Sequence, residues 1–158
     1  MIIEKIALDT NLTLLLAVGR AERGLIARHK RLQRYSDTDY ELLVGQLSQA
    51  QSLITTPNAL TEVSNIARYG IYGASRARVM YSVRALACDC GEVYLPSKEV
   101  VMMTEFERLG LADCAWLAML GQHTTLLTVD NNLYLAALTQ GHRAINFDHV
   151  RASRGLAQ

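Results

Sequence analysis

The sequence has few cysteines and no long apolar run, and each shortage excludes a class of protein. Only Cys88, Cys90 and Cys114 occur among 158 residues. An odd number without a Cys-x-x-Cys pair argues against a disulfide framework or a zinc site, and favours the reducing cytoplasm. No apolar run reaches the roughly 20 residues that span a bilayer, so we expect no membrane partner. The opening residues lack the pattern of a signal peptide.

A large excess of charge of one sign is also absent. The 16 Lys and Arg residues nearly balance the 15 Asp and Glu residues, for a net charge of +1. Attraction to nucleic acid must therefore be local. Six basic residues and one acidic residue fall within residues 20–34; the basic ones are Arg20, Arg23, Arg28, Lys30, Arg31 and Arg34. We predict a helical hairpin insertion at about 20–51 whose basic tip grips phosphates. A solvated helix face is the alternative.

Strand-like and helix-like segments alternate along the chain. Half of the residues are apolar, which is enough for the core of one domain over residues 1–158. Strands are predicted at 2–8, 53–55, 92–95, 125–129 and 143–147. Helices are predicted at 11–18, 40–50, 57–67, 75–88, 98–109, 113–121 and 133–139, with a break at Gly110. This alternation predicts an α/β fold, a three-layer α/β/α sandwich around a mainly parallel sheet.

Four carboxylates stand where a parallel α/β sheet binds ligands, beyond the carboxyl ends of its strands. Asp9 and Asp130 end the first and fourth predicted strands. Asp113 begins a helix after the third strand, and Glu62 lies about one and a half turns into the helix after the second. Such an oxygen-only set suits Mg²⁺ or Mn²⁺, and without a cation its members would repel one another. Helix capping by the aspartates and solvent exposure of Glu62 are the alternatives.

The segments around these residues resemble the PIN-domain family of nucleases. Residues 8–11 resemble the Asp that ends the family's first strand, and residues 57–63 resemble its Pro-x-x-x-x-Glu helix. Residues 111–115 resemble its third acidic position, and residues 127–131 its Thr-x-Asp element. The order and rough spacing agree over nearly the whole chain. The insertion and the isolation of Asp113 from other acidic residues depart from the compact members.

The resemblance implies a divalent-metal-dependent endoribonuclease that leaves a 5′-phosphate. Asp9, Glu62, Asp113 and Asp130 would then be the catalytic residues and the ligands of Mg²⁺ or Mn²⁺. Thr10, Asn11 and Thr128 would orient carboxylates or water, with ordinary capping as the alternative. The RNA contacts would be Arg28, Lys30, Arg31, Arg34, Arg68 and Arg76, the last two beside the aromatic residues Tyr69 and Tyr72.

Partners and rival functions follow from the same resemblance. Many small PIN proteins are toxins of type II toxin–antitoxin pairs, so an antitoxin protein is an expected partner, and a homodimer is another. The first rival is a non-catalytic PIN-like module that binds RNA or protein. The second rival is a phosphatase, which would usually place a second Asp two residues after the nucleophilic Asp, where this chain has Asn11.

Overall fold

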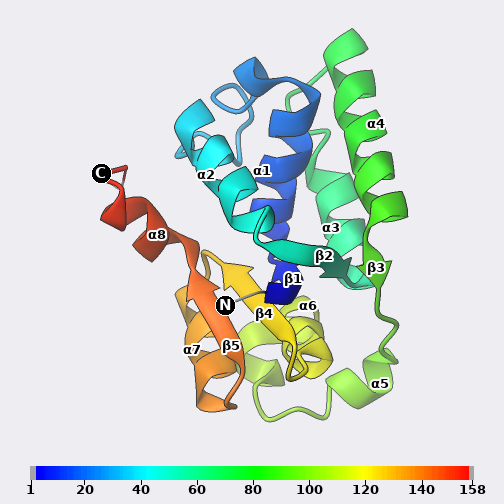
Figure 1. Ribbon diagram of the computed structural model, residues 1–158. Coiled ribbons are helices and arrows are strands. Elements are labelled where there is room, and N and C mark those ends of the chain that lie inside the picture. Colours follow the sequence, from blue (N-terminus) through cyan, green and yellow to red (C-terminus); the bar gives the residue numbers. More distant parts are fainter. Residues whose placement is uncertain (1–2, 157–158) are drawn as a thin grey trace.

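The computed structural model describes residues 3–156 and shows a sheet covered by helices (Figure 1). Its strands are β1 (Ile3–Leu8), β2 (Ala50–Thr55), β3 (Gly91–Glu92), β4 (Thr124–Thr128) and β5 (Arg143–Asn146). All five are parallel, in the order β3-β2-β1-β4-β5. The predicted three-layer α/β/α architecture is therefore confirmed.

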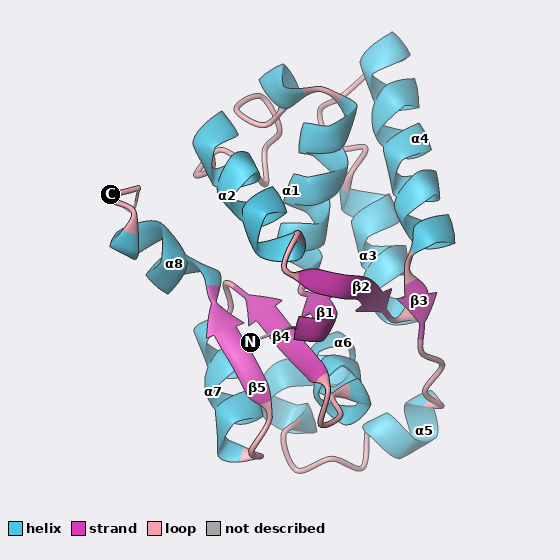
Figure 2. Cartoon of the chain, in the orientation of Figure 1, coloured by secondary structure: helices cyan, strands magenta, loops and turns pink. Residues whose placement is uncertain are grey.

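The helices form a larger layer and a smaller layer, which Figure 2 shows above and below the sheet. The larger layer holds α1 (Thr10–Ala21), α2 (Asp37–Leu47), α3 (Pro57–Ile66), α4 (Gly73–Asp89) and α8 (Phe147–Ser153). The smaller layer holds α5 (Ser97–Val100), α6 (Phe106–Met119) and α7 (Asn131–Thr139). Among residues 3–156, no helix has the length and apolarity needed to cross a membrane.

The pleat of β1 divides the core between these layers. Ile6 and Leu8 pack with α1, α3 and α4, whereas Ala7 packs with α6 and α7. Successive side chains of a strand point to opposite faces, so a continuous apolar strand serves both layers. Trp116 of α6 is fully buried in the smaller layer. The core therefore fixes β1 in the middle of the sheet, and with it the place where β1 ends.

Several predicted boundaries are wrong. The strand predicted at 92–95 has only the two residues Gly91–Glu92, and the helix predicted at 98–109 is interrupted between α5 and α6. The helix predicted at 40–50 lies at Asp37–Leu47, and α8 was not predicted. The break at Gly110 is confirmed, since its φ of 80° lies in the left-handed region that glycine tolerates. Ile2, the first residue of the predicted strand 2–8, lies outside the described residues.

The predicted hairpin insertion contains one separate helix rather than two. Its first arm is the end of α1 followed by a 3₁₀ turn at Arg23–Leu25, and its second arm is α2. The loop between the arms is anchored by His29, whose buried Nε2 lies 3.0 Å from the Ile66 carbonyl oxygen at the end of α3. The amide of Arg31 donates to His29 Nδ1. The loop of residues 26–36 is therefore fixed against α3.

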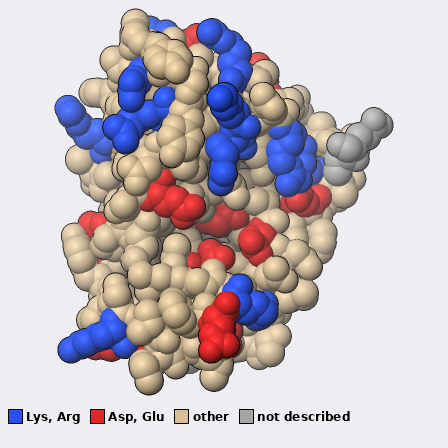
Figure 3. Space-filling model, turned by 180° about the vertical axis from the view of Figure 1, so that it is seen from behind, with Lys and Arg blue, Asp and Glu red and all other residues tan. Residues whose placement is uncertain are grey.

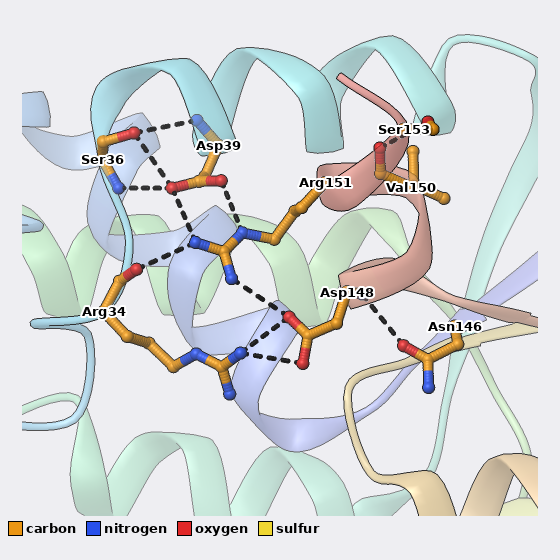
Figure 4. A network of polar contacts seen from close by, with 8 residues as sticks. All are labelled: Arg34, Ser36, Asp39, Asn146, Asp148, Val150, Arg151 and Ser153. Atoms are coloured by element: carbon orange, nitrogen blue, oxygen red, sulfur yellow. Dashed lines mark hydrogen bonds and ion pairs between the residues drawn. The ribbon is translucent and has the colours of Figure 1, made fainter. Parts of the chain in front are cut away.

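A network of two arginines and two aspartates joins α8 to α2 and to the loop before it (Figure 4). Arg151 of α8 donates from Nε to Asp39 Oδ1 at 2.6 Å and from Nη1 to Asp148 Oδ1 at 3.1 Å. Arg34 donates from Nη2 to both oxygens of Asp148, at 2.7 and 2.8 Å. We call these four residues the charge clip. Because Arg151 and Asp39 are both buried, the clip holds the carboxyl-terminal helix on the body of the fold.

Candidate active site

Two of the predicted site residues stand at the ends of neighbouring strands. Asp9 directly follows β1, and Asp130 follows β4 by two residues. The strands pair in parallel, with Leu8 opposite Leu127, so their carboxyl ends meet at one edge of the sheet. The strand-end placement expected from the sequence is confirmed for this pair. This edge carries the candidate active site.

Asp9 is buried and held by three hydrogen bonds. Its Oδ1 accepts from the amide of Leu12 at 2.8 Å, while its Oδ2 accepts from Thr128 Oγ1 at 2.6 Å and from the amide of Val129 at 2.7 Å. Burial raises the pKa of Asp9 above its usual range, although these hydrogen bonds oppose the shift, and the charge of Asp130 adds to it. The carboxylate is therefore fixed in position at an electrostatic cost.

The capping alternative also holds for both strand-end aspartates. Asp9 is the N-cap of α1, and Asp130 is the N-cap of α7, where its Oδ1 accepts from the amide of Leu133 at 2.9 Å. Thr128 connects the two caps, because its hydroxyl donates to Asp9 and accepts from the amide of Asp130 at 2.9 Å. The predicted orienting role of Thr128 thus has a geometric basis. Capping and a place at the site coexist in the same side chains.

Glu62 reaches the site from α3. Thr10, the first residue of α1, donates from Oγ1 to Glu62 Oε2 at 3.0 Å. This contact ties α3 to the helix that follows Asp9. Asn11, the other residue predicted to orient the site, is half-buried beside Thr10 and forms no side-chain hydrogen bond within residues 3–156. The structure therefore gives a contact for Thr10 but none for Asn11.

Asp113 lies in α6, three residues after the break at Gly110. Burial raises the pKa of Asp113 to about 7, and the negative charges of Asp130, Asp9 and Glu62 add to the rise. Asp113 therefore lies within electrostatic reach of each of the other three carboxylates. No hydrogen bond to the Asp113 carboxyl exists within the described part of the chain. Asp113 is half-buried and has no cationic partner there.

Acidic side chains form a band on one face of the molecule. Figure 3 shows Asp and Glu side chains across the middle of the face opposite to that of Figure 1, with Lys and Arg side chains above them. The positive charges above this acidic band suit a polyanionic ligand, because a phosphate backbone needs cations along its path.

The donor chemistry of the four residues fits a hard divalent cation. Mg²⁺ and Mn²⁺ prefer carboxylate oxygens, and the charges of the set would be offset by such an ion. One oxygen of Glu62, one of Asp130 and both of Asp113 accept no hydrogen bond within residues 3–156. Over the same residues, no group of three or more His, Cys, Asp or Glu side chains converges closely enough to hold a metal ion. The chemistry fits, whereas the side chains would need to draw together around an ion.

The predicted RNA-contacting residues divide into paired and unpaired cations. Arg34 forms an ion pair with Asp148, while Arg28, Lys30 and Arg31 in the same loop pair with no acidic residue within residues 3–156. The side chain of Lys30 lies next to Gly70, because a β-carbon at position 70 would be 3.9 Å from the Lys30 side chain. Lys30 and the buried His29 thus bring this loop beside the end of α3, two residues before the exposed Arg68. Arg76, half-buried in the first turn of α4, is also unpaired within that range.

Tyr35 is a residue near the site that the sequence analysis missed. It is buried, and the guanidinium carbons of Arg34 and Arg151 lie 5.3 and 5.2 Å from its ring centroid. Burial raises the pKa of Tyr35 to about 12, and the negative charges of Asp9 and Asp148 reinforce the rise. Its ring therefore packs against the two arginines of the charge clip. No motif or spacing in the sequence marks it.

Comparison with known proteins does not assign the chain to a family. No family model matches the sequence. No curated protein matches it either. The function must therefore be argued from the site itself.

Proposed function

We propose that the protein is a divalent-metal-dependent endoribonuclease. The proposal depends above all on one observation: burial raises the pKa of Asp113 to about 7 and the negative charges of Asp130, Asp9 and Glu62 add to the rise, while within residues 3–156 no cationic side chain pairs with any of the four carboxylates. Carboxylates in such a setting favour either a proton or a metal ion. The resemblance of the surrounding segments to PIN-domain nucleases selects the metal ion and an RNA substrate.

The four carboxylates would have different roles in holding the metal ion. Asp9 is the fixed member, since Thr128 and two backbone amides orient it. Glu62, Asp113 and Asp130 retain free oxygens and would complete the ligand set. A bound Mg²⁺ or Mn²⁺ would supply an activated water and offset charge at the phosphate under attack. Because the pKa of Asp113 is raised to about 7, a bound cation would compete with the proton of its carboxyl group.

RNA is the substrate class that the surroundings support. Lys and Arg side chains lie above the acidic band, and the loop that carries the unpaired Arg28, Lys30 and Arg31 is anchored through His29 to the far end of the helix that carries Glu62. Lysine and arginine provide affinity for a phosphate backbone of any sequence. A role as the toxin of a type II pair, an antitoxin that covers the acidic edge, and a homodimer are parts of the proposal that come from the resemblance alone.

A non-catalytic binding module is the second candidate. The observation that favours it is the absence, within residues 3–156, of three side chains already converged on one metal position. Such a module would bind RNA through the same basic surface without cutting it.

Cleavage of a mixed pool of single-stranded and structured RNA separates the two candidates. Purified protein is incubated with Mg²⁺, Mn²⁺ or EDTA, beside Asp9→Asn and beside Ser64→Ala as a variant outside the site. We expect metal-dependent cutting that Asp9→Asn loses and Ser64→Ala retains. RNA binding without cutting under either metal would favour the binding module. Hydrolysis of a small phosphoester in place of RNA would instead point to a phosphatase.

A further inference from the structure

A groove of about 450 Å³ opens beside the acidic site, between α3 and α6. One wall is a face of α3 and the other is the short stretch Leu111–Ala112. Glu62 lines the groove, and Asp113 follows its far wall by one residue, so the groove is continuous with the carboxylate cluster. A cavity of this volume is in the range of pockets that accept small organic groups.

The α3 wall is polar in a regular way. Asn58, Thr61, Glu62 and Asn65 recur at the helical spacing of one face and all line the groove. The hydroxyl of Thr61 is occupied, because it donates to the carbonyl oxygen of Pro57 at 2.8 Å. By contrast, the side-chain amides of Asn58 and Asn65 form no hydrogen bond to any residue in the range 3–156. Each amide offers donors and an acceptor to whatever enters the groove.

We propose that this groove binds an unstacked nucleobase of single-stranded RNA, next to the phosphate that the carboxylates address. This inference rests on the proposed function and adds a subsite to it. Asn58 and Asn65 would form hydrogen bonds with the edge of the base, while Leu111 and Ala112 contact its apolar face. Unpaired RNA is read in this way, through splayed bases that pack on side chains and bond through their edges. An asparagine amide matches a base edge that presents a donor beside an acceptor.

The geometry also explains why the subsite suits single strands. A base inside a duplex has its Watson–Crick edge paired and its faces stacked, so it cannot enter a groove between two helices of the protein. The groove shares Glu62 with the acidic cluster, and one nucleotide carries both a base and a phosphate. Base recognition in the groove would therefore set which phosphate lies at the carboxylates.

The test measures binding rather than cutting. A fluorescent single-stranded RNA and a series of derivatives, each lacking the base of one nucleotide, are titrated with the full chain in EDTA. We expect loss of one base to weaken binding to the wild-type protein about tenfold, the scale of two lost hydrogen bonds. The Asn58→Ala/Asn65→Ala variant should bind the intact RNA about as weakly as wild type binds that derivative, and should not distinguish the two. Alanine suits both helical positions, so the fold is retained.

Ser64→Ala is the matched control, since Ser64 lies on α3 but lines a different groove. It should keep the wild-type response to base removal. Equal binding of all derivatives by the wild type, or an unchanged base dependence in the double variant, would overturn the inference. Because no metal is present, base-dependent binding by a protein that never cuts RNA would uphold the subsite and reject the nuclease. RNA cleavage by a protein whose binding does not depend on any base would uphold the nuclease and reject the subsite.

Discussion

The pKa values of buried aspartates are shifted in opposite directions in the charge clip and at the acidic site. In the clip, burial pushes the pKa of Asp39 upward, but hydrogen bonds from Arg151 and Ser36 outweigh it and leave the pKa lowered. At the site, burial raises the pKa of Asp9 and of Asp113, and neighbouring carboxylates add to the rise. Each buried charge of the clip is matched inside the protein. At the site, no cationic side chain within residues 3–156 forms an ion pair with Asp9 or Asp113.

The presence or absence of a cationic partner distinguishes carboxylates that stabilise the fold from carboxylates that are available to bind a ligand. A buried carboxylate without a cationic partner costs folding free energy, so its presence needs another explanation. At the site this cost falls on the buried Asp9 and in part on the half-buried Asp113, whereas Glu62 and Asp130 are exposed. The ring of Tyr35 lies beside the guanidinium groups of Arg34 and Arg151, and the charge of Asp9 contributes to the raised pKa of Tyr35.

The largest effect on stability is expected from breaking the clip. Arg151→Met leaves Asp39 buried without its partner and should lower the free energy of unfolding by about 3–5 kcal/mol. Urea denaturation measures the loss. Arg154→Met, which replaces an exposed arginine of the same segment, is the control and should change stability little. If Arg151→Met were no more destabilising than Arg154→Met, the clip would have no role in holding α8.

Removing the hydroxyl that connects the two site aspartates should have an intermediate effect. Thr128→Val keeps the shape of the side chain but deprives Asp9 of a donor and the amide of Asp130 of an acceptor. We expect a stability loss of about 1–3 kcal/mol. Cleavage should fall about 10- to 100-fold, the scale seen when partners of metal ligands are removed. Thr139→Val, at an exposed threonine of α7, should leave both unchanged, and equal effects of the two substitutions would contradict the connecting role.

A smaller, pH-dependent effect is expected at Asp113. Its folded-state pKa is about 7, whereas an unfolded aspartate titrates near 4, so the folded chain binds the extra proton between these values. Stability from this group is therefore lost as pH rises from about 4 to about 7. Asp113→Asn removes the loss and should be more stable than wild type above pH 7, by an amount on the order of 1 kcal/mol. A stability difference that does not vary with pH, measured by urea denaturation, would refute the assignment.

The smallest effect distinguishes paired from unpaired arginines of one loop. Arg31→Gln should flatten the salt dependence of RNA binding, by up to about 0.7 in the logarithmic slope for one lost phosphate contact. Arg34→Gln should change it less, because Asp148 occupies that guanidinium. Replacing Arg28, Lys30 and Arg31 together by glutamine should weaken binding at low salt. Equal slopes for Arg31→Gln and Arg34→Gln would show that the ion pair does not matter to RNA.

The sequence predicted the sheet and the places of the site carboxylates because both depend on local signals. Apolar runs of strand length, followed by a capping residue, locate the ends of β1 and β4, and therefore Asp9 and Asp130. The helical spacing after Pro57 places Glu62 on α3. The left-handed φ of Gly110 places Asp113 near the start of a new helical segment.

The rest depends on tertiary contacts that no local pattern encodes. Arg34 was expected to contact RNA, yet it pairs with Asp148, which lies 114 positions away in the chain. The roles of Tyr35 and Arg151 follow only from their contacts in the folded chain, because no sequence motif marks either residue. α8 has only seven residues, and its buried Arg151 pairs with Asp39 of α2, a contact that no local sequence pattern reveals. Asn58 and Asn65 are the exception, because their helical spacing from Glu62 in the sequence already places the three side chains on one face of α3.

Binding of Mn²⁺ in the absence of RNA tests the central claim most directly. Calorimetric titration slightly below neutral pH, repeated in buffers of different ionisation enthalpy, measures both affinity and proton release. We predict saturable binding that releases a proton, because the pKa of Asp113 must fall when a cation approaches it. The Asp9→Asn/Asp113→Asn variant should show neither. An absence of binding to the wild-type protein, or binding that the variant retains in full, would contradict the conclusion that these carboxylates await a metal ion.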